Sequence, residues 1–483
     1  MLAIVRMSNR RATAMIYRAH AIAAHMSTSA GSCMDQPILF QSNGCTRTFV
    51  LNRAKKLNAL NTVMLDSLRR QVELWSKSDL CRMIIGTGTG RAFCAGGDVA
   101  SVLQDALLEE TRPQAVEFFQ KEFELFYILS RLPKPYVAVL DGITMGGGVG
   151  LAIHAPFRVA TEKTMFAMPE TKIGFFPDVG ASYFLSRLDG EVGTYLALTS
   201  DKLVGREVFE HGIATHYITS RSVPSLLSHL GEFENPSFSQ INRTIEELHS
   251  ERQSHEPNGK LTGTVRQALD TAFSHNTVEE ILQNLEVLTS ISDTRVQSWA
   301  KQTLEALHMR SPTSLKVALS ALRRGKQMTL LEVLHMELRI ASAFCSDASP
   351  DFRTGVRAVL IDKTEGRPAW SPDNITDVSS EIVDRFFSEE SPYQSVMSKL
   401  SVGNYFQDRD FDFMTYSLPS ESELSESIRS CCKEGSITVP DLLTSMDRVC
   451  RRKFGTKEKI LDIIHRKCDV KARDGTEVVT WKE

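Results

Sequence analysis

The residues most capable of chemistry lie between positions 136 and 178. An apolar stretch at 136–140 leads into MGGGVG at 145–150, and two acids, Glu170 and Asp178, follow. Successive glycines let a backbone approach a ligand closely, because no Cβ intrudes and a positive φ costs little. A helix that begins there would point its free N–H groups at that ligand. The ligand atom expected there is a carbonyl oxygen that gains negative charge during the reaction. The two acids would supply proton transfer or nucleophilic attack.

The elements that must position these residues alternate between short strands and amphipathic helices. Helical spacing of apolar residues predicts helices over 61–76 and 114–130, and a second glycine-rich turn at 96–98 precedes a predicted helix over 99–106. Apolar strands are predicted at 49–52, 83–86, 136–140, 157–160 and 165–168. Repeated ββα units account for this alternation economically.

The second half of the chain has a different pattern. Residues 233–260 are polar and contain Pro and Gly, as expected of a surface excursion, whereas 261–345 reads as a series of helices. Short amphipathic helices are predicted at 424–432, 441–449 and 457–467, with no chemistry attached. The predicted division is 1–34 as a targeting segment, 35–232 as the core with the site, 233–390 as a helical region, and 391–483 as a helical extension of unknown role.

Composition excludes several classes of protein. A net charge of −3 over 483 residues gives no electrostatic argument for nucleic acid or an anionic membrane as the main partner. The nine cysteines include no C-x-x-C pair and no neighbouring histidine at metal spacing, so neither a metal site nor a disulfide framework is predicted. No apolar run approaches the roughly 20 residues that span a bilayer. The cysteine pattern is most simply explained if the protein is located in a reducing compartment.

The N-terminal segment has the composition of a mitochondrial presequence. Residues 1–34 contain no acid, and four arginines are interleaved with apolar residues ahead of a Ser/Thr cluster at 27–29. A basic tail without a targeting role is the alternative, and Met26 offers a second start that would remove most of the segment. The predicted location of the mature protein is the mitochondrial matrix.

The glycines do not match the common nucleotide-binding motifs. The sequence GTGTG at 86–90 lacks the third glycine of a dinucleotide fingerprint, and no G-x-x-x-x-G-K-[S/T] is present. A G-x-S-x-G nucleophile elbow is also absent. A serine hydrolase and a dinucleotide-binding protein are therefore disfavoured.

Several motifs together resemble one superfamily. They are FCAGGD at 93–98, GITMGGGVG at 142–150, AMPET at 167–171, GFFPDVG at 174–180, SPTSL at 311–315 and GVRAVLIDK at 355–363. These residues resemble the crotonase (enoyl-CoA hydratase/isomerase) superfamily, and within it the 3-hydroxyisobutyryl-CoA hydrolases, over about 36–390. The resemblance implies an α/β fold: a crotonase-type spiral of repeated ββα units, then a helical C-terminal region and an appended helical extension.

The resemblance also implies roles for individual residues. The oxyanion hole for a thioester carbonyl maps to the backbone N–H groups of Gly97 and Gly147. The substrate-contacting positions map to Gly147 again and to Glu122, Glu170 and Asp178. Coenzyme A is part of the substrate, so no separate cofactor and no metal are implied.

The residue at position 150, a glycine here, distinguishes the hydratases of the superfamily from its hydrolases. Hydratases that resemble this chain carry the first of two glutamates at this position, whereas Asp178 stands where they carry glycine, which is the hydrolase arrangement. By resemblance, Glu170 attacks the thioester carbonyl or acts as general base for water; both routes stay open. Asp178 would bind the 3-hydroxyl or help protonate the departing sulfur, and Glu122 would order the network.

The function implied is hydrolysis of 3-hydroxyisobutyryl-CoA to 3-hydroxyisobutyrate and CoA in valine degradation. Two alternatives remain: a structural subunit of the mitochondrial ribosome, since members of this family occur there, and an enoyl-CoA hydratase or isomerase. The predicted partner is an acyl-CoA, without DNA or a membrane span, and self-association stays open.

Plainer structural roles compete with the catalytic ones. Glu170 and Asp178 could be ordinary cap or turn residues, and Glu122 could lie on a solvated helix face. His154 and His216 are expected to be structural and Cys94 to be a small buried residue. Arg91, Lys55 and Lys56 are candidates for contact with CoA phosphates. Residues 179–182 read VGAS where the hydrolases resemble VGGG, and the added side chains would trim the acyl pocket.

Overall fold

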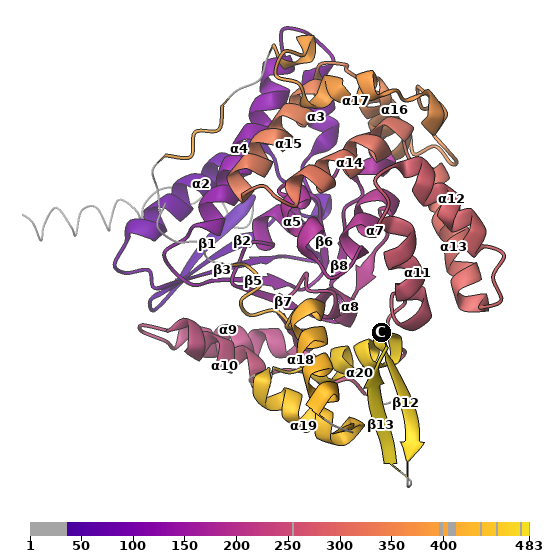
Figure 1. Ribbon diagram of the computed structural model, residues 1–483. Helices are drawn as coiled ribbons and strands as arrows, with labels where there is room; N and C mark the ends of the chain where they lie inside the picture. Colours follow the sequence, from indigo (N-terminus) through magenta and orange to yellow (C-terminus); the bar gives the residue numbers. More distant parts are fainter. Residues whose placement is uncertain are drawn as a thin grey trace, which may run out of the picture.

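The computed structural model describes residues 36–482 apart from 254–255, 396–398, 404–411, 435–436, 451–452 and 474–475. The predicted targeting segment, 1–34, lies outside these residues. Two sheets form the centre of the described chain, with helices on both sides (Figure 1). The larger sheet has the order β1-β2-β3-β5-β7-β10, and the smaller has the order β4-β6-β8-β9.

The two sheets arise from one repeated unit. The strands of the larger sheet are β1 (Ile38–Asn43), β2 (Thr46–Leu51), β3 (Met83–Gly88), β5 (Tyr136–Leu140), β7 (Phe157–Ala160) and β10 (His216–Tyr217). Those of the smaller are β4 (Ala92–Cys94), β6 (Ile143–Met145), β8 (Met165–Ala167) and β9 (Leu203–Val204). Three times in succession the chain places one strand in the larger sheet and the next in the smaller. This confirms the repeated ββα units that the alternation of strands and helices predicted, in the spiral that the resemblance implied.

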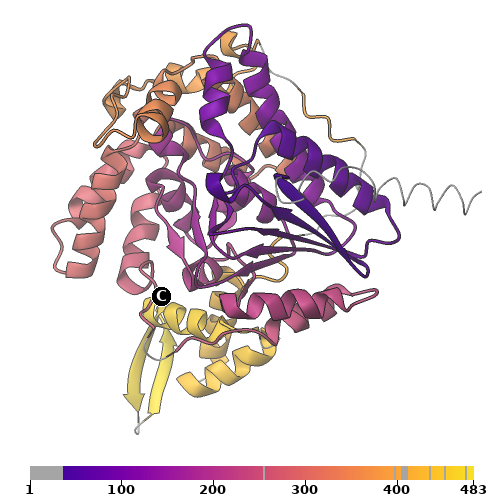
Figure 2. The same cartoon turned by 180° about the vertical axis from the view of Figure 1, so that it is seen from behind.

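The central strands of the larger sheet are buried on both faces, as their apolar residues require, whereas the edge strand β1 is largely exposed. Alternate residues face opposite sides: Ile85, Val137 and Val139 belong to one apolar cluster, while Ile84 and Ala138 belong to the main core. The first cluster is covered by α9 (Val223–Gly231) and α10 (Phe238–Glu246), which run beneath the sheet (Figure 2). The polar excursion expected at 233–260 therefore includes a packed helix, and Ile241 and Ile245 carry the apolar spacing that buries it.

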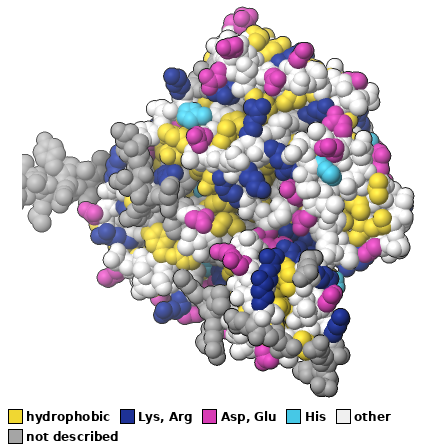
Figure 3. Space-filling model, viewed as in Figure 1, with side chains coloured by type: hydrophobic (Ala, Val, Ile, Leu, Met, Phe, Trp, Pro, Cys, Tyr) yellow, Lys and Arg dark blue, Asp and Glu magenta, His cyan; other side chains and the backbone are white. Residues whose placement is uncertain are grey.

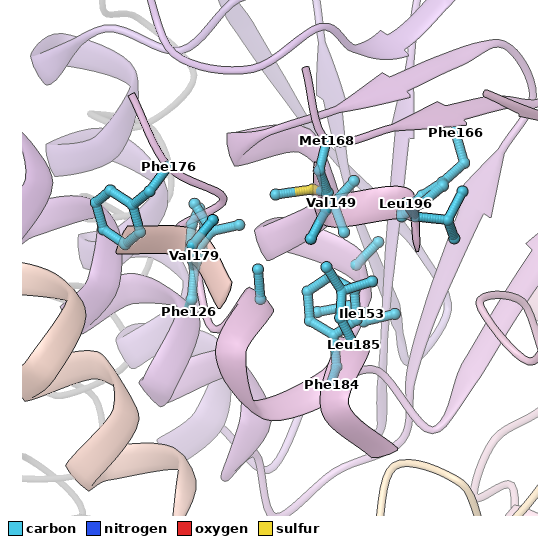
Figure 4. Close-up of a cluster of buried hydrophobic side chains, with 14 of the residues drawn as sticks. Phe126, Val149, Ile153, Phe166, Met168, Phe176, Val179, Phe184, Leu185 and Leu196 are labelled. Carbon is cyan, nitrogen blue, oxygen red and sulfur yellow. The ribbon is translucent and has the colours of Figure 1, made fainter. Parts of the chain in front are cut away.

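Helices of the core pack on the other face of the sheet. They are α2 (Thr62–Lys77), α3 (Val99–Ala106), α4 (Arg112–Ser130), α5 (Gly147–Ala152), α6 (Ala181–Phe184), α7 (Val192–Thr199) and α8 (Arg206–Glu210). Asn61 caps α2 by accepting a hydrogen bond from the Met64 N–H at 3.0 Å. In the packing between α5 and α6, Val149 and Ile153 lie beside Phe184 and Leu185 (Figure 4).

The C-terminal helical region covers the core. Its helices are α11 (Gly263–Phe273), α12 (Val278–Leu288), α13 (Thr294–His308), α14 (Pro312–Gly325), α15 (Leu330–Cys345), α16 (Asp351–Val356) and α17 (Ser380–Phe387). Helix α15 runs beside α4 (Figure 1) and contributes Leu334, Leu338 and Phe344 to the main core. No helix in the described residues is both long and apolar enough to cross a bilayer. Acidic and basic side chains are interspersed over the face seen in Figure 3.

The extension contains the three predicted helices together with a sheet that sequence analysis did not predict. The helices are α18 (Glu421–Glu434), α19 (Val439–Val449) and α20 (Thr456–Lys467). The sheet has the order β11-β13-β12, from β11 (Ile437–Thr438), β12 (Cys468–Arg473) and β13 (Thr476–Trp481). These elements share a separate apolar core that includes Leu424, Leu442 and Ile463. The extension forms its own layer below the sheet (Figure 1).

Ionic contacts fix this layer to the core. The Glu421 carboxylate accepts from Arg466 at 2.9 Å and from Arg266 of α11 at 3.0 Å. Both arginines are buried. A carboxylate shared between two guanidinium groups is directional, so it sets the orientation of α18 against the helical region.

Arg158 is the largest fully buried side chain and connects the sheet to the segment that leads into the extension. Its guanidinium donates to the carbonyl oxygens of Ile213 at 2.6 Å and Phe413 at 2.7 Å, and to the Ser417 hydroxyl at 3.0 Å. The carbonyls of Ala155 and Gly212 accept two further bonds. Burial lowers the pKa of Arg158 to about 9.

We predict that Arg158→Met destabilises the protein by at least about 3 kcal/mol, because several buried carbonyl oxygens then lose their donor. The measurement is the free energy of unfolding in denaturant. Arg47→Met is the control, since Arg47 lies on β2 and donates to the Gly44 carbonyl in an exposed contact. A change of about 0.5 kcal/mol is expected there. Equal effects of the two substitutions would contradict the role given to Arg158.

Candidate active site

Two glycine-rich turns meet where adjacent strands end. Strands β4 and β6 run parallel, so the turn after β4 and the turn after β6 lie at the same edge of the smaller sheet. A Cβ on Gly147 would lie 3.4 Å from the backbone nitrogen of Gly97. Gly147 is the first residue of α5, so its N–H has no partner within the helix. The geometry thus brings together the two predicted oxyanion donors.

Glycine is required at these positions for steric reasons. A Cβ on Gly147 would lie 2.2 Å from a carboxylate oxygen of Glu122, and one on Gly148 would lie 2.1 Å from the Cys94 carbonyl oxygen. Gly146 has φ +47°, which L side chains rarely adopt. The glycine run therefore makes space for a carboxylate and for the neighbouring strand.

Gly150 is closed to a larger side chain. A Cβ there would lie 2.2 Å from the Phe126 ring, which α4 projects against α5. The sequence has glycine here in place of the hydratase-type glutamate, and the Phe126 ring leaves no room for such a side chain.

Glu122 and Glu170 lie against these glycines, and Asp178 lies close enough to both acids to feel their charges. Glu122 comes from the middle of α4, Glu170 begins a short 3-10 helix, η3 (Glu170–Ile173), and Asp178 lies in the turn before α6. All three are buried, with exposed fractions of 2%, 6% and 5%. A Cβ on Gly146 would lie 3.0 Å from Oε1 of Glu170. The structure therefore places the predicted acids together, and none lies on a solvated face.

The acids lack ordinary compensation for burial. Oε1 of Glu122 and Oε2 of Glu170 have no hydrogen-bond partner among the described residues. Burial raises the pKa of Glu122, and burial followed by the charge of Glu122 raises the pKa of Glu170. The pKa of Asp178 is raised for the same reasons, by burial first and then by Glu122 and Glu170. Unpartnered, protonatable oxygens aimed at a glycine backbone suit proton transfer or attack on a bound carbonyl.

Glu337 is a fourth acid, which sequence analysis missed. It is fully buried on α15 and accepts from the backbone N–H groups of Gly180 at 2.6 Å and Ser182 at 2.9 Å. Burial raises its pKa to about 7. The signal was available, because Glu337 falls on the apolar stripe of Leu330, Val333 and Leu334 at helical spacing.

Glu337 holds the turn that carries Asp178. Val179 has φ +58° and Gly180 has φ +85°, and a positive φ is strained for a β-branched residue. The carboxylate of Glu337 fixes the two amides that follow, so α15 secures this conformation. At the VGAS departure, Ala181 and Ser182 begin α6 and are both buried.

The remaining candidates take the positions expected of structural or surface residues. Burial raises the pKa of the Cys94 thiol to about 12, so it is no nucleophile. His154 is buried, and its pKa falls to about 3; His216 bonds Thr215 and Asn242. Arg91, Lys55 and Lys56 are exposed. No three His, Cys, Asp or Glu side chains in the described part of the chain gather in an arrangement that could hold a metal ion.

We predict that Glu122→Gln stabilises the protein at pH 8 and much less at pH 5. Because the pKa of Glu122 is raised above its ordinary value of 4.5, the folded state binds more protons than the unfolded state above that pH. Ionisation of Glu122 therefore lowers the free energy of unfolding as pH rises. Glutamine does not ionise, so the substitution removes this loss of stability. The expected gain at pH 8 is at least about 1 kcal/mol, roughly one pKa unit.

Thermal unfolding at the two pH values measures this difference. The control is Glu117→Gln on the solvent side of the same helix, where the side chain is 53% exposed. Its unfolding temperature should change little at either pH. A lower unfolding temperature for Glu122→Gln at pH 8 would refute the prediction.

Comparison with known proteins agrees with this geometry. Residues 46–387 match the family model described as enoyl-CoA hydratase/isomerase. A solved structure titled carnitinyl-CoA dehydratase, from Mycobacterium thermoresistibile, superposes with a TM-score of 0.67 at 30% identity and covers 77% of this chain and 100% of its own.

Two kinds of relative share about the same identity. The small ribosomal subunit protein mS47 of Neurospora crassa is 40% identical over 98% of this chain and 95% of its own length. The mitochondrial 3-hydroxyisobutyryl-CoA hydrolase of Xenopus laevis is 40% identical over 77% of this chain and 94% of its own. The human enzyme of the same name is 41% identical over 77% and 93%. The chain therefore belongs to the enoyl-CoA hydratase/isomerase family, within the crotonase superfamily.

Proposed function

We propose that this protein hydrolyses 3-hydroxyisobutyryl-CoA in mitochondria, in the matrix, as a step of valine degradation. The single observation that carries the proposal is the meeting of Gly97 and Gly147 next to Glu122 and Glu170, with Asp178 within reach of the charges of both acids and the position of a hydratase glutamate closed by Phe126. Relatives named for this activity align over 77% of the chain. The site contains both the donors and the acids that thioester hydrolysis needs.

In the proposed reaction, the thioester oxygen accepts hydrogen bonds from the N–H groups of Gly97 and Gly147. These donors stabilise the oxyanion as it forms; loss of one such donor costs about 3 to 4 kcal/mol in comparable sites. Glu170, as carboxylate, either attacks the carbonyl carbon or takes a proton from an attacking water. The carbon–sulfur bond then breaks, and the CoA thiolate leaves and takes up a proton. Where Glu170 has attacked, water then cleaves the mixed anhydride, which releases 3-hydroxyisobutyrate and restores the carboxylate.

Asp178 and Glu122 have supporting roles in this proposal. Asp178 binds the 3-hydroxyl or delivers the proton to sulfur, and its raised pKa keeps a proton available. Glu122 lies against the Gly147 backbone and sets the charge on Glu170, since each carboxylate disfavours ionisation of the other. Glu337 positions the turn of Asp178 without touching the substrate.

We predict that Glu170→Gln and Asp178→Asn each lower kcat by at least about 100-fold, because each removes a group that transfers a proton or attacks. Release of free thiol from 3-hydroxyisobutyryl-CoA measures this. Glu117→Gln should retain the parental rate. Parental rates no higher than those of the two variants would refute the hydrolase proposal, and equally efficient hydration of crotonyl-CoA would favour a hydratase instead.

A second candidate function is association with the small subunit of the mitochondrial ribosome. One observation favours it: similarity to the Neurospora crassa ribosomal protein extends over 98% of this chain, whereas similarity to the hydrolases covers 77%. The difference includes the extension, which has its own core and its own sheet. A folded layer added to a complete catalytic core is a plausible carrier of a separate binding role.

We predict that the full chain sediments with the small ribosomal subunit in gradients of mitochondrial lysate, and that Glu170→Gln sediments identically although its hydrolysis is lost. The substitution changes one buried carboxylate and leaves the surface unaltered. Sedimentation of the protein entirely free of ribosomal subunits would exclude this role. Loss of co-sedimentation in Glu170→Gln would show that the two roles depend on one site.

A further inference from the structure

A basic cavity lies apart from the acids. It has a volume of about 610 Å³ and is bordered by η3, the end of α7 and one side of α13. None of the four buried acids lines it. Five cationic residues and one carboxylate line it, and these are Lys172, Lys202, Lys260, Arg295, Arg310 and Asp201.

The single carboxylate is already paired. Asp201 accepts from Lys260 at 2.6 Å and from the Tyr195 hydroxyl at 2.6 Å. Arg310 is only 8% exposed and donates to one group, the carbonyl oxygen of Thr199, at 2.6 and 3.0 Å. Lys172 is half-buried and has no ion pair among the described residues. Two poorly solvated cations therefore face the cavity without a neutralising partner.

The pKa of Lys172 shows that its charged form is disfavoured in this cavity. Burial lowers its pKa, and the charges of Arg310 and Lys202 lower it further. Asp201 opposes this shift only in part, and an anion between Lys172 and Arg310 would offset the repulsion among the cations. Phosphate suits this pair, because a guanidinium binds two oxygens in parallel and an ammonium supplies a compact charge. The rim adds exposed Lys202 and Arg295 for further negative charge.

We propose that this cavity binds a small phosphorylated molecule, with a phosphate group between Lys172 and Arg310. The depth of the two cations favours a small ligand over an RNA backbone, which would meet the exposed rim residues first. Neutral polar groups for the rest of such a ligand are present in Ser298 and Gln302, and Trp299 adds an apolar wall. The proposal is independent of the hydrolase function.

The cavity is nevertheless connected to the acids through η3. Lys172 and Glu170 are both in this four-residue helix. Between them, Thr171 bonds the Ser200 hydroxyl at 2.7 Å and the Leu198 carbonyl oxygen at 3.2 Å. Ser200 also lines the cavity. A bound phosphate would thus contact the same short segment that carries Glu170.

The test is calorimetric titration of the full chain with inorganic pyrophosphate and with ADP. We expect binding that weakens at least about tenfold in Lys172→Gln and in Lys202→Gln, and that weakens with rising salt. Lys301→Gln is the matched control, since Lys301 is exposed on α13 outside the cavity. Lys172→Arg should retain binding, which separates loss of charge from misfolding.

Three results would overturn the proposal. The first is no binding of either probe at about 1 mM, or binding that Lys172→Gln and Lys202→Gln leave unchanged. The second is binding of a short single-stranded RNA, with the same sensitivity to both substitutions, in the absence of pyrophosphate binding. The third is competitive inhibition by pyrophosphate, seen as a rise in the KM for the acyl-CoA with kcat unchanged. The cavity would then belong to the thioester site.

Discussion

Burial of four carboxyl groups near the glycine-rich turns is the constraint on which this structure depends. Glu122 and Glu170 approach within the space that a side chain on Gly147 or Gly146 would fill. Asp178 adds a third charge, and Glu337 holds the turn beneath it. Few of these oxygens have donors, so the surrounding helices must exclude water while they leave the acids unneutralised. Packing against α4 and α15 meets this requirement at a cost in stability, as strained or unpaired groups at functional sites usually do.

The constraint also links the ββα core to the helical region that follows it. Strands β4 and β6 place the two amides, but α15, far along the chain, supplies the carboxylate that fixes the turn of Asp178. The same helix packs on α4, which carries Glu122. Helices that look like an addition in sequence thus complete the site. Figure 4 shows how densely the apolar side chains close around this region.

Most of the core was predictable because its signals are local. Alternating strands and the glycine turns follow from spacing alone, and the motif resemblance gave the fold. The sheet of the extension was missed although the sequence offers a signal for it, because DG at 474–475, a dipeptide typical of two-residue hairpins, stands between the segments that form β12 and β13. Glu337 was missed for another reason: its place on an apolar helical stripe indicates burial, but the amides that it binds are brought to it only by tertiary packing. Likewise, the space at Gly150 became interpretable only with the Phe126 ring in place.

Arg158 has a consequence for the timing of folding during translation. Strand β7 leaves the ribosome more than 250 residues before Phe413 and Ser417, which accept two of the guanidinium's hydrogen bonds. Until those residues emerge, a nascent chain with every core helix already made still carries an incompletely bonded cation at the centre of its sheet. The last layer to be synthesised therefore completes the interior of the first. Synthesis from the N-terminus thus leaves the hydrogen bonds of a core residue incomplete until the segment before the extension has emerged.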